Sequence, residues 1–261
     1  MSGGQEKTPG KWGDLPARLG SAAVMLAIGG AAIWVGGIWF HALVALICGG
    51  MMWEFTRLMN RGESRFALPM GILAGVVLMV TDVLPGQTII PILLAVAVVG
   101  ATQLKKTRLV YGVYAAALIL SCYGLVVIRD VRGAYWIIWL VSLVVVTDVA
   151  GYFAGRLIGG PKFWPKVSPK KTWSGTIAGW VAAAGVGFIF GGPPLVVLSV
   201  FAAFASQMGD AAESALKRWA GIKDSSNLIP GHGGLLDRFD GMLGAALFVL
   251  LMGAALGLPA V

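Results

Sequence analysis

The sequence is poor in charge, cysteine and histidine. Charged residues make up 12% of its 261 positions, whereas a soluble domain carries about 25%. So few charges cannot cover the surface of a soluble globule, and a disordered chain needs high charge and low hydrophobicity. The two cysteines, Cys48 and Cys122, both lie in apolar runs, which excludes a disulfide framework. A membrane protein remains.

Long apolar runs dominate the chain. Apolar residues reach 57% and the mean hydropathy is +0.82. The runs are unbroken, which favours helices over the alternating strands of an outer-membrane barrel. They occupy 19–35, 37–55, 66–81, 88–103, 109–128, 134–154, 176–191, 194–210 and 241–259. The sequence therefore predicts an all-α polytopic integral membrane protein with about nine transmembrane helices, of which 88–103 and 176–191 are short.

The positive charges predict an orientation. With a cytoplasmic N-terminus, all but two of the 20 Lys and Arg residues fall in cytoplasmic segments. The exceptions are Arg129 and Arg132. Residues 1–16 are predicted to form a cytoplasmic tail without a cleavable signal, and 17–261 a single membrane domain. Two long polar loops, 155–175 and 211–240, also fall on the cytoplasmic side, so the chemistry is expected there.

A first candidate cluster contains Asp148, Tyr152 and Arg156. Spacings of four place these side chains on one face of a helix. A carboxylate within an apolar run is costly and usually functional. The alternative is a polar ladder at the membrane edge.

A second candidate cluster follows at 168–175. It contains Ser168, Lys170, Lys171 and Thr172, with Trp173 directly after them. Two lysines and two hydroxyls near a helix N-terminus can hold phosphate. The alternative is an ordinary positively charged cytoplasmic loop with an interfacial tryptophan.

The third cluster is the densest. If helical, Asp210, Glu213, Ser214 and Lys217 share one face. Charges of both signs continue to 240, and helix capping explains only one of the carboxylates. Carboxylates bind Mg²⁺ through a few contacts and leave the other positions to phosphates and water. The pattern favours a site for a metal and nucleotide phosphates.

The two histidines differ in context. His232 lies between glycines, in a turn whose backbone amides can approach an anion; its role is left open. His41 lies in an apolar run without a charged neighbour in sequence and is interpreted as structural.

The segment from Ser214 to Asp240 resembles the diagnostic segment of phosphatidate cytidylyltransferases, also called CDP-diacylglycerol synthases. It reads S-A-L-K-R-W-A-G-I-K-D-S-S-N-L-I-P-G-H-G-G-L-L-D-R-F-D. The run S-P-K-K-T-W at 168–173 and the first cluster fit the same family. One departure is Ser174, where members commonly carry Glu. The specific similarity covers about 147–241, and the N-terminal half agrees only as a hydrophobic pattern.

The resemblance implies transfer of a cytidylyl group from CTP to phosphatidic acid in phospholipid biosynthesis, with Mg²⁺ and a second cation as candidate cofactors. It assigns the metal to Asp210 and Asp237. Catalytic roles fall to Lys217, Arg218, Lys223, Asp224, His232, Arg238 and Asp240. Substrate contacts fall to Asp148, Tyr152, Arg156, Ser168, Lys170, Lys171, Thr172, Glu213, Ser214, Gly233 and Gly234.

The family further implies a bacterial inner (plasma) membrane, a cytoplasmic active site, contact with the lipid bilayer and a homodimer. No nucleic-acid partner is expected. Two other functions stay open at this point. One is a CTP-dependent lipid kinase, or a cytidylyltransferase for another lipid phosphate. The other is a transporter for an anionic solute, although transporters usually show paired repeats.

Overall fold

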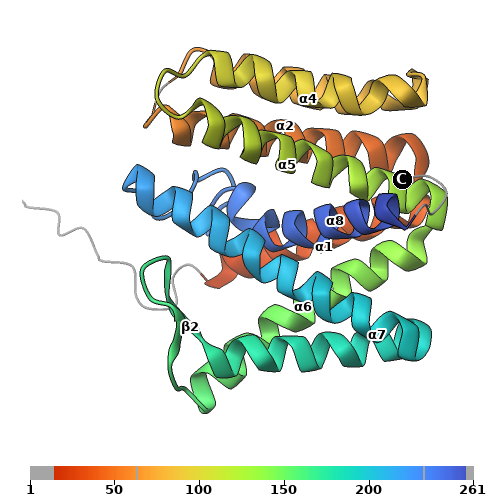
Figure 1. Ribbon diagram of the computed structural model, residues 1–261, viewed down its shortest axis with the longest axis vertical. Coiled ribbons are helices and arrows are strands. Elements are labelled where there is room, and N and C mark those ends of the chain that lie inside the picture. Colours follow the sequence, from red (N-terminus) through yellow and green to blue (C-terminus); the bar gives the residue numbers. More distant parts are fainter. Residues whose placement is uncertain (1–14, 63, 232, 257–261) are drawn as a thin grey trace, which may run out of the picture.

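The computed structural model describes residues 15–62, 64–231 and 233–256. His232 and the predicted tail up to residue 14 lie outside this part of the chain. The helices are α1 (Leu15–Val35), α2 (Gly37–Met59), α3 (Ala67–Met79), α4 (Gly86–Thr102), α5 (Arg108–Val127), α6 (Ala134–Leu157), α7 (Trp173–Ala220) and α8 (Leu236–Ala255). A 3₁₀ turn, η1 (Val80–Val83), extends α3, and a π-helical turn, η2 (Ile128–Arg132), extends α5. Figure 1 shows these helices packed as a layered bundle.

Among the described residues, five helices are long and apolar enough to span a membrane. They are α2, α5 with η2, α6, α7 and α8. Three shorter apolar helices cover Leu19–Val35, Ala67–Val83 and Gly86–Thr102. A predominantly helical membrane protein is therefore confirmed as a class, while nine crossings and the side of the N-terminus stay predictions.

Helix α7 consists of two limbs that fold back on each other. Its backbone leaves helical geometry at Gly191 and Gly192, and prolines follow at 193 and 194. Figure 1 shows the chain reversing at this point, with the first limb running beside α6. The predicted spans 176–191 and 194–210 correspond to these limbs. The second limb continues as helix to Ala220, ten residues beyond the predicted end of the span.

The predicted loop 155–175 contains a β-hairpin, which corrects the purely helical expectation. Strands β1 (Lys162–Trp164) and β2 (Ser168–Thr172) pair antiparallel. The hairpin leads directly into α7, where the Thr172 hydroxyl caps the helix by accepting from the Gly175 N–H at 3.2 Å. Strands of three and five residues containing lysines and a proline show none of the apolar alternation that predicts strands.

Charged residues also meet at the end of the bundle away from the hairpin. His41 on α2 is 2% exposed, and its ring nitrogens lie 2.7 Å from carboxylate oxygens of Asp82 and Asp130. The fold therefore places two carboxylates beside His41, although its neighbours in sequence carry no charge. Nearby, the Arg129 Nε–H donates to the Ile33 carbonyl at 2.7 Å. These contacts tie α1, α2, η1 and η2 together.

Candidate functional site

Three carboxylates meet where the second limb of α7 crosses the start of α8. Ligand oxygens of Asp210, Glu213 and Asp240 all lie within 4.8 Å of one another. The predicted helical face is confirmed, because Ser214 Oγ donates to Asp210 Oδ1 at 3.2 Å. Since Asp240 comes from a different helix, the cluster depends on how α7 and α8 pack.

Two lysines neutralise this cluster. Lys171 of strand β2 forms an ion pair with Asp210. The Lys217 ammonium lies 2.5 Å from Glu213 and 2.6 Å from Asp237. Glu213 is fully buried, so its charge needs this partner. The β-hairpin, α7 and α8 are thereby joined by charge as well as by packing.

Glycines allow α7 and α8 to approach closely at this crossing. A Cβ at Gly209 would collide with the Asp240 carbonyl, and a Cβ at Gly244 would collide with the Ala205 carbonyl. Small residues at a helix crossing let two backbones come together in a membrane protein. The close approach brings Asp210, which follows Gly209, within reach of Asp240.

The loop between α7 and α8 is organised around Asp237. Its Oδ2 accepts hydrogen bonds of 2.8 Å from the Ser225 N–H, the Ser225 hydroxyl and the Gly234 N–H. Its Oδ1 receives the Lys217 ammonium. Gly233 adopts a φ of +85°, a conformation that glycine adopts without strain. These contacts link Asp237 to Lys217 and hence to Glu213.

A residue that the sequence reasoning missed, Glu54 on α2, also holds this loop. It is 0% exposed. Its carboxylate accepts from the Ser226 hydroxyl at 2.5 Å, and from the N–H groups of Leu235 and Leu236 at 3.0 and 2.7 Å. The signal was present, because Glu54 is the only acidic residue of the predicted span 37–55.

Two cavities flank the carboxylate cluster. The first, of about 340 Å³, is the polar cavity: most of its lining residues are polar or charged, and it lies between α6, the hairpin and α7. Most of the first two predicted clusters lines it: Asp148, Tyr152, Arg156, Lys170, Lys171 and Thr172. The Arg156 guanidinium donates to the Tyr152 hydroxyl at 2.7 Å. The predicted helical face of Asp148, Tyr152 and Arg156 is thus confirmed, and it lies opposite the two lysines.

The second cavity is an apolar groove of about 1030 Å³ between α5, α7 and α8. Asp240 and Gly209 line it beside apolar side chains that include Phe201, Phe248 and Leu251. Along α8, Asp240 and Leu251 are eleven residues apart, which is about 16 Å of helix. On α7 the lining runs from Phe201 to Trp219, so the groove passes the carboxylate cluster and continues on both sides of it.

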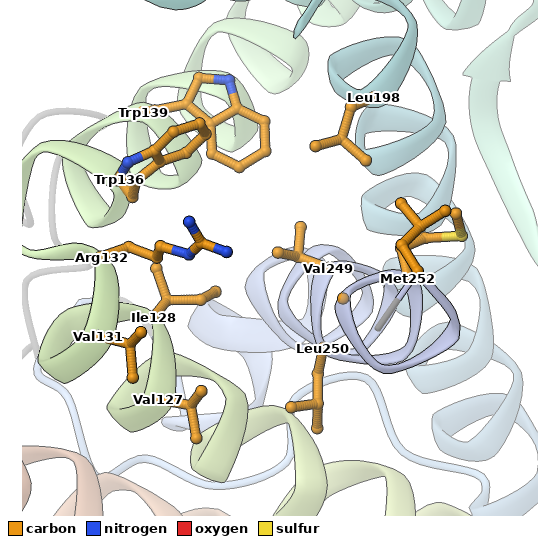
Figure 2. Close-up of a pocket in the computed structure, with 12 residues that line it drawn as sticks. Val127, Ile128, Val131, Arg132, Trp136, Trp139, Leu198, Val249, Leu250 and Met252 are labelled. Carbon is orange, nitrogen blue, oxygen red and sulfur yellow. The ribbon is translucent and has the colours of Figure 1, made fainter. Parts of the chain in front are cut away.

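A third cavity, of about 200 Å³, lies at the other end of α8 (Figure 2). Trp136, Trp139 and Arg132 line one side of it, and Leu198 and Val249 lie across from them. Among the described residues no carboxylate lines this cavity, so they do not offer the donor set of the carboxylate cluster there.

Other predicted site residues lie around the cluster rather than within it. Lys170, Arg218 and Lys223 are exposed and form no ion pair within the described ranges. Asp224 is exposed beside Gly233, and Arg238 is exposed in the first turn of α8. Ser168 pairs with Trp164 in the hairpin. The roles predicted for these residues stay predictions.

The donor set fits a hard divalent cation. Asp210, Glu213 and Asp240 offer carboxylate oxygens, the ligands that Mg²⁺ prefers. Within the described part of the chain, the Glu213 carboxylate has one polar partner, Lys217. Asp237, predicted from the resemblance as a metal ligand, has both oxygens engaged by Lys217, Ser225 and Gly234.

The chain matches the cytidylyltransferase family over residues 16–256 and belongs to that family. Within it, the chain is 36% identical to the phosphatidate cytidylyltransferase of Brucella suis, over 94% of this chain and 96% of that protein. The phosphatidate cytidylyltransferase of Haemophilus influenzae is 41% identical over 45% of each chain. That of Helicobacter pylori is 45% identical over 44% of this chain and 46% of its own.

The glycine crossing generates a prediction. We expect Gly209→Ala and Gly244→Ala each to lower cytidylyltransferase activity at least tenfold and to cost about 1–3 kcal/mol of stability, because the added methyl pushes the two backbones apart. Activity and melting temperature of the purified protein measure both effects.

The matched control for this prediction is Gly185→Ala on the first limb of α7, where an added Cβ meets nothing within 4 Å. Its activity should equal that of the wild type. Full activity in Gly209→Ala would show that the site does not require the close crossing.

Proposed function

We propose that the protein transfers the cytidylyl group of CTP to phosphatidic acid, forming CDP-diacylglycerol and pyrophosphate. The observation that carries this proposal is the carboxylate cluster with its two lysines, which lies between a polar cavity and an apolar groove. A reaction between a soluble nucleotide and a lipid phosphate needs both surroundings at one point. Membership of the cytidylyltransferase family and the names of the relatives support the same reaction.

The geometry supports a division of labour between the two substrates. In this proposal the nucleotide phosphates bind in the polar cavity, where Lys170, Lys171 and Arg156 supply positive charge. The lipid phosphate reaches the cluster at Asp240, and its acyl chains lie along the groove. Both substrates are anionic, so the cations are needed to bring them together.

The reaction forms a bond between a phosphatidate oxygen and the α-phosphorus of CTP and breaks the bond to the β-phosphate. A phosphate monoester has a second pKa of about 6, so the attacking oxygen is largely ionised at neutral pH. No strong general base is required, and His232 is not needed in that role. In this proposal Lys171 and Lys217, which border the carboxylate cluster, neutralise charge on the phosphates as the pyrophosphate leaves.

We propose that Asp210 and Asp240 hold Mg²⁺, with Glu213 beside them. When bound, the ion neutralises the triphosphate and stabilises the pyrophosphate leaving group. The prediction of Asp237 as a ligand is retained for test, and so is a second cation. A homodimer also remains a proposal, supported by the family resemblance alone.

The reaction itself is tested with purified protein in detergent. We expect pyrophosphate release from CTP only when phosphatidic acid is present, and label from α-³²P CTP in the lipid. Label from γ-³²P CTP should leave as pyrophosphate. Lipid labelled by γ-³²P CTP would indicate a lipid kinase instead, and turnover without phosphatidic acid would contradict the proposal.

The metal assignment is tested by titrating Mg²⁺ against CTP turnover. We expect Asp210→Asn and Asp240→Asn to lower turnover about 100-fold or more and to raise the Mg²⁺ needed for half-saturation, because a neutral amide replaces an anionic ligand. Asp237→Asn decides the remaining assignment. A loss with a raised Mg²⁺ requirement identifies a ligand, and a loss at unchanged requirement identifies a residue that only holds the loop.

We further propose that the cluster faces the cytoplasm in a bacterial inner membrane. The distribution of Lys and Arg supports this orientation. The test introduces single cysteines at Lys166 in the hairpin and at Pro193 in the bend of α7, in a background lacking Cys48 and Cys122. An impermeant thiol reagent on intact cells should label position 193 and spare 166. Labelling at position 166 alone would show that the topology is the inverse of the proposed one.

A further inference from the structure

Glu54 lies on α2, yet the hydrogen bonds of its carboxylate reach the loop before α8 and the start of α8. Its partners lie 172 to 182 positions further along the chain. Two of them are the N–H groups of Leu235, the N-cap residue of α8, and of Leu236, its first residue. The first four N–H groups of a helix have no partner within the helix. Glu54 thus supplies the cap that α8 lacks in its own sequence.

The carboxylate is suited to this position by charge as well as by shape. A carboxylate is stabilised at the positive end of the helix dipole. An ionised carboxylate accepts only, at about four positions. Glu54 accepts from three donors: the N–H groups of Leu235 and Leu236 and the Ser226 hydroxyl. The Ser225 hydroxyl has one proton, which the shorter contact gives to Asp237. Glu54 is therefore satisfied although it is fully buried.

The Ser225 hydroxyl lies between the Glu54 carboxylate and Asp237, near the carboxylate cluster. Ser225 Oγ lies 3.2 Å from Glu54 Oε2 and 2.8 Å from Asp237 Oδ2. Asp237 and Asp240 occupy the first turns of α8, so they move with the helix end that Glu54 holds. Gly234 lets these groups converge, because a Cβ there would collide with both Ser225 Oγ and the Glu54 carboxylate.

We propose that Glu54 is a positioning residue for the cytidylyl transfer. It fixes the N-terminus of α8, and through it the placement of Asp240 and Asp237 opposite Asp210 and Lys217. The expected effect on kcat rests on the proposed function. The expected effect on the N-terminus of α8 rests on the hydrogen bonds alone.

Glu54→Gln is a sharp test because it keeps the size of the side chain. Each carboxylate oxygen of Glu54 takes one backbone N–H of α8. Glutamine replaces one oxygen by an NH₂ donor. Whichever way the amide turns, one of these N–H groups then faces another N–H, and a serine hydroxyl can rotate to adapt where the backbone cannot.

The matched control is Thr56→Val on the same helix. Thr56 is 2% exposed, and its hydroxyl lies 2.8 Å from that of Tyr111. The substitution therefore also removes a buried hydrogen bond from α2, but it touches neither the loop nor α8.

The experiment compares wild type, Glu54→Gln and Thr56→Val as full-length purified protein. It measures kcat, KM for CTP, the Mg²⁺ requirement, melting temperature and amide hydrogen exchange. We expect Glu54→Gln to lower kcat at least tenfold with less than a threefold change in KM, and to speed exchange in 223–237. Thr56→Val should lower the melting temperature while kcat stays within about twofold and exchange in the loop is unchanged.

Equal losses of kcat in the two variants, or a wild-type kcat in Glu54→Gln, would overturn the proposal. If Glu54→Gln does not accumulate as folded protein, Ser226→Ala carries the test, because it removes one donor to Glu54. We expect at least a threefold loss of kcat there, and an unchanged kcat would overturn the proposal. If the wild type itself fails to transfer cytidylyl groups, the proposed function is wrong, whereas loop exchange still decides whether Glu54 holds α8.

Discussion

The close crossing of α7 and α8 is the constraint on which the site depends. Carboxylates on two helices meet only if the backbones between them approach more closely than side chains normally allow, and Gly209 and Gly244 remove those side chains. In lipid, where apolar side chains gain little by packing together, close backbone contact is itself a main source of helix association. The same glycines therefore serve the stability of the bundle and the placement of Asp210 against Asp240.

Three carboxylates lie close together at this crossing, and two lysines offset their negative charge. Lys217 lies between Glu213 and Asp237, and Lys171 reaches Asp210 from the hairpin. Each lysine comes from an element other than α8, so the charges hold three elements together. A polar cavity opens on one side and an apolar groove on the other. The arrangement suits a reaction that takes one substrate from water and the other from a membrane.

The sequence predicted the features that repeat along one helix. Apolar runs predicted the helices, and spacings of three and four correctly placed Asp210, Glu213 and Lys217 on one face. The sequence did not predict contacts between segments that are distant along the chain. Glu54 was overlooked and His41 showed no charged neighbour, because the partners of both residues lie on other elements, far away in the sequence. The hairpin was missed because strands this short carry no pattern of their own.

The position of Glu54 in the chain has a consequence for how the protein is made. Its partners are synthesised 172 to 182 residues later, which at 5–20 residues per second is roughly ten to forty seconds. During that interval the carboxylate sits at the end of an inserted helix without the groups that will satisfy it. The Glu54 carboxylate therefore gains its partners only after the start of α8 has been synthesised, and a chain that stops before α8 leaves that carboxylate without them.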